Sequence, residues 1–116
     1  MRFKLILAVV DERRSRDLIK AAREAGATGS TVITGVRGEG RNRSFGIFGL
    51  EISDVRDAIL FLVEEHRARH ILETLARVGE FDDTPGTGIA VQLNVEDALG
   101  VRHQMQALAD ELKEEI

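Results

Sequence analysis

Period-two alternation of apolar and polar residues predicts that the chain starts with a β-strand. In residues 2–10 one face carries Phe3, Leu5, Leu7 and Val9, and the other face becomes apolar toward the middle of the segment. Successive side chains of a strand point to opposite faces of the sheet, so two apolar faces are typical of a strand that is covered on both sides. We therefore expect a central strand here.

Three later segments also have the composition or the alternation of β-strands. Residues 30–37 are rich in β-branched side chains, and Gly35 within them indicates a bulge or a close backbone approach. Residues 58–63 are apolar on both faces, which predicts a second central strand. Residues 89–95 alternate again and predict the fourth strand.

Helical spacing of apolar residues separates these strands. After Asp11, which can cap a helix, an amphipathic segment reaches Gly26, where a left-handed C-terminal cap is expected. A second amphipathic helix follows residue 64 and stops at Gly79. A third helix is predicted over residues 103–115.

The order of these elements is βαββαβ, the split βαβ arrangement, in which two helices cover one face of a four-stranded antiparallel sheet. The sequence thus predicts an α+β, ferredoxin-like sandwich with a C-terminal helix, built as a single domain over residues 1–116. The other sheet face stays bare, and we expect it to carry apolar residues such as Ile6, Leu60 and Leu62. Because a large exposed apolar face is unfavourable in water, self-association is expected to bury it.

Composition narrows the classes of function. The net charge of −4 argues against general nucleic-acid binding, because neutralising phosphates takes a concentrated basic surface. The absence of cysteine excludes disulfides, thiolate metal sites and a thiol nucleophile, and it favours a cytoplasmic protein. No apolar run approaches the ~18 residues of a membrane span, so we expect no membrane insertion. No nucleophile motif or carboxylate pair stands out, which predicts a protein that is not an enzyme and has no catalytic residues.

Two glycine-rich segments are candidates for binding. Residues 38–57 are too long for a simple hairpin turn and contain exposed-looking Phe45, Ile47 and Phe48. Residues 82–88 combine a proline-fixed turn with two glycines, a combination that can point successive backbone amides at an anion. A tight connection into the fourth strand explains the same turn, so its motif alone leaves both interpretations open.

Three stretches make the chain resemble the PII signal-transduction family, the nitrogen regulatory protein P-II superfamily, over nearly its whole length. They are AGATGSTVITGVRGEGR at residues 25–41, ILFLV at 59–63 and PGTGIAVQLNVEDALGVR at 85–102. They look like the family's second strand with the entry to its long T-loop, the strand after that loop, and the B-loop with the fourth strand and C-terminal loop. The resemblance places a T-loop over residues 38–57 and a B-loop over residues 82–88.

The resemblance implies a cytoplasmic homotrimer that binds an adenine nucleotide in the clefts between its subunits. Through its T-loop it would signal to a target protein, such as a membrane transporter or a metabolic enzyme. Carried over residue by residue, the nucleotide-binding positions are Thr31, Gly40, Arg41, Leu62, Gly86, Thr87, Gly88 and Arg102. The effector surface would be formed by Phe45, Ile47 and Phe48.

Two departures from the family pattern change the expected ligand. Ile89 stands where the family has a lysine that holds terminal phosphates, and Gly100 stands at one of two arginine positions in the C-terminal loop. With fewer cations available, we expect AMP, ADP or a cyclic nucleotide rather than ATP. The loop from Arg41 to Asp57 is also shorter than in the nitrogen regulators and contains no tyrosine, which excludes tyrosine uridylylation.

Two other functions remain open at this point. A trimer similar to the CutA family, which shares the fold, would bind a divalent metal, since His66, His70 and Glu73 lie at helical spacing. A solvated helix face with intrahelical ion pairs explains the same spacing, so we predict no obligatory metal. A scaffold module would use the surface of the trimer and bind no small molecule.

Overall fold

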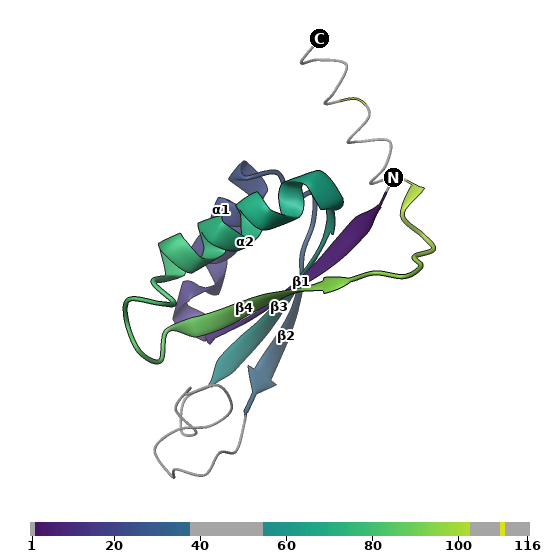
Figure 1. The fold of residues 1–116 in the computed structure, drawn as a ribbon. Coiled ribbons are helices and arrows are strands. Elements are labelled where there is room, and N and C mark those ends of the chain that lie inside the picture. Colours follow the sequence, from purple (N-terminus) through teal and green to yellow (C-terminus); the bar gives the residue numbers. More distant parts are fainter. Residues whose placement is uncertain (1, 38–54, 103–109, 111–116) are drawn as a thin grey trace.

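The computed structural model describes residues 2–37, 55–102 and 110. The elements in chain order are β1 (Phe3–Asp11), the 3₁₀ helix η1 (Glu12–Arg14), α1 (Ser15–Glu24), β2 (Thr31–Val36), β3 (Arg56–Glu64), α2 (Glu65–Gly79) and β4 (Gly88–Asn94). The strands form one antiparallel sheet in the order β2-β3-β1-β4, and both helices lie on one side of it (Figure 1). The predicted α+β, ferredoxin-like fold is confirmed.

The register of the central strands decides which side chains enter the core. Ile6 of β1 lies opposite Phe61 of β3, and Ala8 lies opposite Ile59. All four are buried beneath the helices, which complete the core with Leu18, Ala22, Ala68, Ile71 and Leu75. The prediction that Ile6 lies on the bare face is therefore wrong. Its side chain has 0% exposure, because it shares the helix-covered face with its partner on β3.

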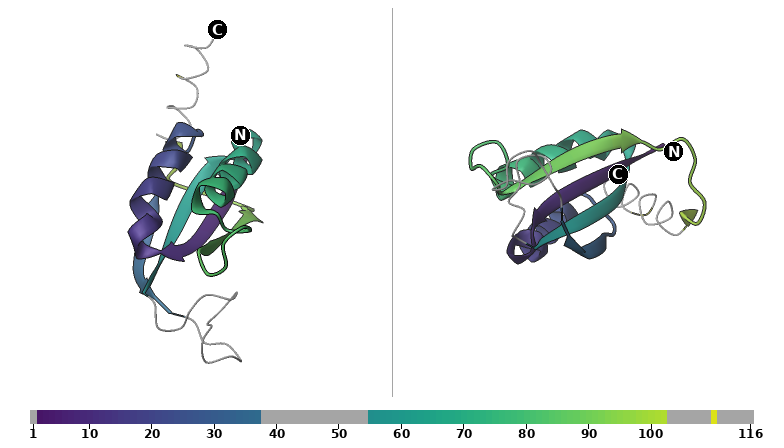
Figure 2. Two further views of the ribbon diagram at one scale, coloured as in Figure 1. Left: turned by 90° about the vertical axis from the view of Figure 1, so that its left-hand side faces the viewer. Right: turned by 90° about the horizontal axis from the view of Figure 1, so that it is seen from below.

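The opposite sheet face is apolar, and among the described residues no helix covers it (Figure 2). The positions predicted for Leu60 and Leu62 are confirmed, since these residues alternate with the buried side chains of β3. In the single chain Leu93 is 45% exposed and Ile33 52%. We call this surface the bare sheet face, and it consists of Leu5, Leu7, Val9, Ile33, Ala58, Leu60, Leu62, Ile89, Val91 and Leu93.

Glycines mark the ends and irregularities of these elements, mostly as predicted. Gly26 follows α1 with a φ of +119°, the left-handed conformation expected at that position. The bulge predicted at Gly35 is confirmed, because the register between β2 and β3 shifts around it and its φ is +72°. The second helix does stop at Gly79, but the left-handed residue is the next one, Glu80, with a φ of 56°.

The segment predicted as a T-loop connects two strands whose nearest residues pair with each other in the sheet. Val36 of β2 lies opposite Arg56 of β3, so the last two residues of segment 38–57 belong to β3. The rest of this segment, apart from residue 55, lies outside the described residues. So does the helix predicted over 103–115, apart from residue 110.

Two valines offer a matched test of the bare sheet face. Val91 and Val32 are both 39% exposed, but Val91 lies opposite Leu7 on the bare sheet face, whereas Val32 lies opposite Ile59 on the helix-covered face. We expect the parent to be trimeric, and Val91→Lys to make it monomeric because a trimer would bury the new charge. Val32→Lys should leave the assembly unchanged. Light scattering during size-exclusion chromatography measures the mass, and equal masses for the two variants would contradict the prediction.

Candidate functional site

One end of the sheet gathers the segments that the sequence marks for binding. Segment 38–54 joins the sheet there through the paired residues Val36 and Arg56. At the same end β1 finishes and β4 begins at Gly88. The turn between α2 and β4, residues 80–87, also lies there (Figure 1). We call this region the loop end.

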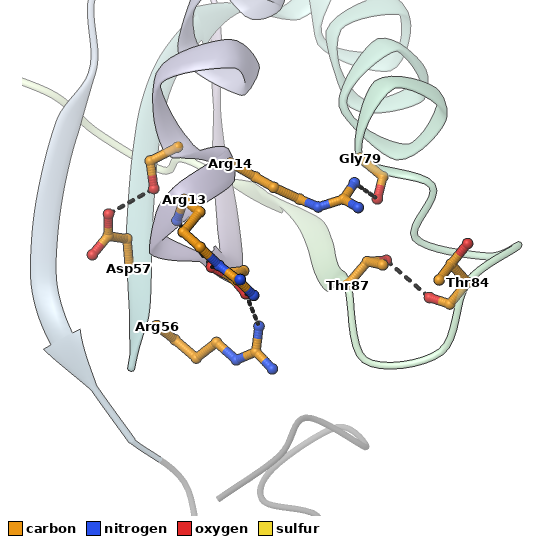
Figure 3. Close-up of polar contacts among 9 residues, drawn as sticks. Arg13, Arg14, Arg56, Asp57, Gly79, Thr84 and Thr87 are labelled. Atoms are coloured by element: carbon orange, nitrogen blue, oxygen red, sulfur yellow. Dashed lines mark hydrogen bonds and ion pairs between the residues drawn. The ribbon is translucent and has the colours of Figure 1, made fainter. Parts of the chain in front are cut away.

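A threonine holds the turn between α2 and β4 together from inside. The hydroxyl oxygen of Thr87 lies 3.0 Å from the carbonyl oxygen of Thr84 (Figure 3). It lies equally far, 3.0 Å, from the carbonyl oxygen of Glu80, and Thr87 is 7% exposed. The amide of Thr84 also donates to the Glu80 carbonyl, at 2.9 Å. Because the hydroxyl proton of Thr87 is used within the turn, the group that Thr87 can offer to a ligand is its backbone amide.

The ring of Phe81 explains two of the glycines around this turn. A Cβ at Gly79 would lie 2.3 Å from Cε1 of Phe81, and one at Gly88 would lie 2.6 Å from the same atom and 2.9 Å from the carbonyl oxygen of Val9. Gly86 differs, because nothing lies within 4 Å of its Cβ position and its φ of +78° is what favours glycine. The turn therefore has a tightly packed inner side and open space at Gly86, where an anion can approach the backbone.

A carboxylate between two guanidinium groups fixes the start of β3. Oδ2 of Asp11 lies 2.6 Å from Nη2 of Arg13 and 3.6 Å from Nη1 of Arg56, whose side chain is only 4% exposed (Figure 3). The hydrogen bond from the Arg13 side chain contributes most to lowering the pKa of Asp11 from 3.8 to about 2. The backbone amide of Arg13 and the positive charges of Arg13 and Arg56 lower it further, and together they outweigh the effect of partial burial, which raises it. The carboxylate thus stays ionised and holds the buried guanidinium in place.

Two further contacts join distant parts of the chain at the loop end. Oγ of Ser15 donates to Oδ2 of Asp57 at 2.6 Å, with both residues buried, so the start of α1 is tied to β3. Nη1 of Arg14 donates to the carbonyl oxygen of Gly79 at 3.1 Å and lies 3.6 Å from the Glu80 carboxylate. Thus η1 and the first residue of α1 together hold both the root of segment 38–54 and the turn at residue 80.

Sequence reasoning missed these anchoring residues. Ser15 and Asp57 are 42 positions apart and Arg14 and Gly79 are 65 apart, so no local pattern connects them. One signal was available: two charged residues, Arg56 and Asp57, directly precede an apolar strand. Charged residues are rarely buried without a hydrogen-bond or ion-pair partner. If Arg56 and Asp57 were buried at the start of this strand, each would therefore need such a partner.

The described nucleotide-binding candidates fall into two groups. Gly86, Thr87 and Gly88 meet at the loop end, whereas Thr31 lies in the row of Leu7, halfway along β1, and Leu62 lies nearer the opposite end of the sheet. Thr31 is in the same cross-strand row as Val91, which is three residues along β4 from Gly88. With typical strand spacings, Thr31 is about 14 Å across the sheet and about 10 Å along it from Gly88. One chain does not bring the two groups together.

Of the remaining candidates, the structure describes only Arg102, which lies away from the loop end. Arg102 is exposed, and its neighbour Val101 lines a hollow of about 190 Å³ with Arg2 and Phe3, at the end of the sheet where β1 begins. Five predicted residues lie outside the described part of the chain, namely Gly40, Arg41, Phe45, Ile47 and Phe48.

The histidines of α2 do not assemble a metal site. Oε1 of Glu73 accepts a hydrogen bond from Nε of Arg69 at 2.8 Å, and Nε2 of His66 lies 3.8 Å from Oε1 of Glu64. In the part of the chain that the structure describes, no three His, Cys, Asp or Glu residues are grouped to hold a metal ion. The ion-pair interpretation of this helix face therefore has contacts to support it.

Comparison with known families matches residues 3–105 to the nitrogen regulatory protein P-II family. The chain belongs to the P-II family. Its resemblance to PII signal-transduction proteins is thereby confirmed over most of its length. A comparison with curated proteins finds no match.

Solved structures of PII-like proteins share the fold of this P-II family member. It is similar to CPII from Thiomonas intermedia K12 bound to ADP, AMP and acetate, with a TM-score of 0.64 and 14% identity over 85% of this chain and 91% of CPII. It is also similar to a PII-like signalling protein from Thermus thermophilus, with a TM-score of 0.59 and 28% identity over 82% of this chain and 91% of that protein.

Replacing the buried hydroxyl of Thr87 tests how the turn is held. We expect Thr87→Val to lower the free energy of unfolding by about 1 kcal/mol, because the side chain keeps its volume and loses its hydrogen bonds to Glu80 and Thr84. Thr87→Ser keeps the hydroxyl and should retain most of the stability. Urea denaturation measures both, and a Val variant as stable as the parent would refute this role for the hydroxyl.

The lowered pKa of Asp11 predicts a pH-dependent stability. A carboxyl whose pKa falls from 3.8 to about 2 on folding stabilises the fold above pH 4, and this contribution is lost as the pH falls toward 2. Asp11→Asn should therefore flatten the decrease in unfolding free energy between these pH values. Asp17→Asn, on the exposed surface of α1, should leave the decrease as in the parent. Parallel curves for the parent and Asp11→Asn would contradict the prediction.

Proposed function

We propose that this protein is a regulatory sensor that binds an adenine nucleotide between the subunits of a homotrimer. Membership of the P-II family favours a regulator over an enzyme. The observation that carries the proposal is the division of the predicted ligand residues between the loop end and the Thr31 side of the sheet. A neighbouring copy that packs against the bare sheet face can bring the Thr31 side of its own sheet next to the loop end of the first copy.

Adenine nucleotides are the ligands that the site supports best. The open backbone at Gly86 suits a phosphate, since successive amides of a glycine turn bind anions. CPII, which shares the fold, is bound to ADP, AMP and acetate in one structure and to ADP and bicarbonate in another. These ligands make ADP and AMP the first candidates for this chain.

The residues around the turn favour few phosphates. Ile89 lies opposite Val9 and contributes to the bare sheet face, so it supplies no cation where the family's lysine stands. Gly100 is exposed with a φ of +87° and supplies none either. Arg41 and Arg102 remain as the predicted phosphate partners. The proposed ligand is therefore AMP, ADP or a cyclic nucleotide rather than ATP.

Residues 38–57 would transmit the ligand state to a target protein through Phe45, Ile47 and Phe48. The root of this segment and the turn near Gly86 are both held by the residues that follow β1. A ligand that shifts the turn would therefore act on the element that fixes the start of β3. A cytoplasmic trimer could meet a transporter or a metabolic enzyme in this way. No helix within the described ranges has the length and apolar character to cross a membrane.

Calorimetry with AMP, ADP, cyclic AMP, ATP and divalent ions tests the ligand class. We expect AMP, ADP or cyclic AMP to bind the trimer more tightly than ATP. Tighter binding of ATP would overturn the ligand preference. Failure of every nucleotide to bind would overturn the sensor function itself and favour a scaffold, and binding of a divalent ion alone would favour the metal alternative.

Arg102 and the assembly state test the position of the site. Arg102→Ala should weaken nucleotide binding about tenfold or more, because hydrogen bonds between charged groups contribute about 1.5–3 kcal/mol. Arg69→Ala, which removes an exposed arginine on α2, serves as the control and should bind like the parent. The folded monomer made by Val91→Lys should lose nucleotide binding. A monomer that binds with full affinity would place the site within one chain.

A further inference from the structure

The turn between α2 and β4 has no cation of its own to hold an anion. Residues 80–88 contain three acidic residues and neither lysine nor arginine. One of the three, Glu80, lies 3.6 Å from Nη1 of Arg14, and the other two are exposed. Their negative charge opposes the approach of an anion to the open backbone at Gly86. A phosphate can therefore bind there only if a neighbouring element supplies positive charge.

The end of β1 is the element next to this turn. Gly88, the first residue of β4, lies opposite Val10 of β1. The next pair in the same register is Thr87 and Asp11, and adjacent strands are about 4.8 Å apart. Side chains alternate along a strand, so Asp11 lies on the same face as Val9, which is the bare sheet face. The Asp11 carboxylate is thus beside the turn, on the face that a neighbouring copy would cover.

Two guanidinium groups meet at this carboxylate. Nε and Nη2 of Arg13 donate to the two oxygens of Asp11 at 3.0 and 2.6 Å, and Nη1 of Arg56 lies 3.6 Å from Oδ2 (Figure 3). Two positive groups and one negative group leave one net positive charge. The Arg56 side chain is 4% exposed and that of Arg13 is 83% exposed, so the charge that a dissolved anion can reach is on Arg13.

The other arginines at the loop end are less well placed. Arg14 donates to the carbonyl oxygen of Gly79 at 3.1 Å, on the side of the turn where α2 ends. Arg37 follows β2, and both β3 and β1 lie between β2 and β4. With typical strand spacing, Arg37 is about 14 Å across the sheet from the turn. Within the described part of a single chain, Arg13 is therefore the cation best placed for an anion at the turn.

The pair with Asp11 also sets the direction of the Arg13 side chain. Bidentate pairing holds the plane of the guanidinium group and uses two of its five N–H donors. The backbone amide of Arg13 donates to Oδ1 of Asp11 at 2.9 Å, which fixes the start of the side chain as well. Guanidinium groups match the spacing of phosphate oxygens, and an ordered side chain loses less conformational entropy when a ligand binds.

We propose that Arg13 binds a phosphate of the nucleotide at the turn around Gly86. This inference rests on the proposed sensor function and names the residue that selects a nucleotide over its nucleoside. Asp11 is a positioning residue that orients Arg13, and Arg56 offsets the charge of Asp11. One net positive charge suits a ligand with few phosphates.

Calorimetry with ADP tests the role of Arg13. We expect Arg13→Gln to weaken ADP binding about tenfold or more, because it removes a hydrogen bond between charged groups. Arg16→Gln is the matched control, since Arg16 is exposed on α1, and it should bind ADP like the parent. Equal ADP affinities for the parent and Arg13→Gln would overturn the assignment of Arg13.

Adenosine separates a contact with the phosphate from a change in the shape of the site. It lacks the phosphates, so Arg13→Gln and the parent should bind it equally well, measured by the displacement of fluorescent ADP. The preference for ADP over adenosine should therefore fall about tenfold or more in Arg13→Gln. If adenosine affinity falls as much as ADP affinity, Arg13 shapes the site and touches no phosphate, and the proposal is wrong.

Arg13→Lys separates the charge from the pairing with Asp11. Lysine binds phosphate as a point charge but cannot pair with a carboxylate in the bidentate way of arginine. We expect this variant to recover most of the ADP affinity that Arg13→Gln loses. A lysine variant that binds as weakly as Arg13→Gln, with the circular dichroism spectrum of the parent, would show that Arg13 acts only through Asp11 and would refute the phosphate contact.

The parent protein distinguishes failure of this inference from failure of the sensor function. A parent that binds ADP while Arg13→Gln binds it equally well contradicts the role of Arg13 alone. A parent that binds no nucleotide contradicts the sensor function, and the role of Arg13 is then wrong as well.

Discussion

The sheet of this protein has two apolar faces, and the helices within the described residues cover only one of them. The rest of the structure depends on this imbalance. Alternation along β1 and β3 places Ile6 and Phe61 beneath the helices and Leu7 and Leu60 on the other side. Burial of the first face beneath the helices stabilises the folded chain, and the exposed apolar surface of the other face favours association. Covering the second face would therefore add to the stability of the folded chain.

The proposed trimer would account for the separation of the predicted ligand residues in a single chain. The turn around Gly86 lies at the loop end, whereas Thr31 lies halfway along the sheet and Arg102 lies near the end where β1 begins. Association through the bare sheet face would set the loop end of one copy against a neighbour, so burial of apolar surface and assembly of a ligand site become the same event. The polar contacts of Asp11 and Ser15 then act as local supports that keep the loop end in shape before any ligand arrives.

Local patterns in the sequence predicted the strands, the two described helices and the bulge at Gly35. The spacing of apolar residues and the conformational freedom of glycine depend on residues close together in the chain, so they can be recognised without the tertiary structure. They failed where long-range packing decides. Ile6 looked like a bare-face residue until its partner on β3 was known. The second helix ends at Gly79 as predicted, but the sequence did not show the reason: Glu80 is the left-handed residue, and Phe81 leaves no room for a side chain at position 79. The hydroxyl of Thr87 likewise turned out to serve the turn itself.

The pairing of Val36 with Arg56 has a consequence for how such proteins can diversify. The segment between these residues begins and ends at positions fixed by the sheet, and the buried guanidinium of Arg56 is held by Asp11. The entropy of closing a loop grows only with the logarithm of its length, about 0.6 kcal/mol for each doubling. Insertions, deletions and exchanges within the segment therefore cost the folded body little. Evolution can therefore rewrite the segment between Val36 and Arg56 while the folded body stays the same.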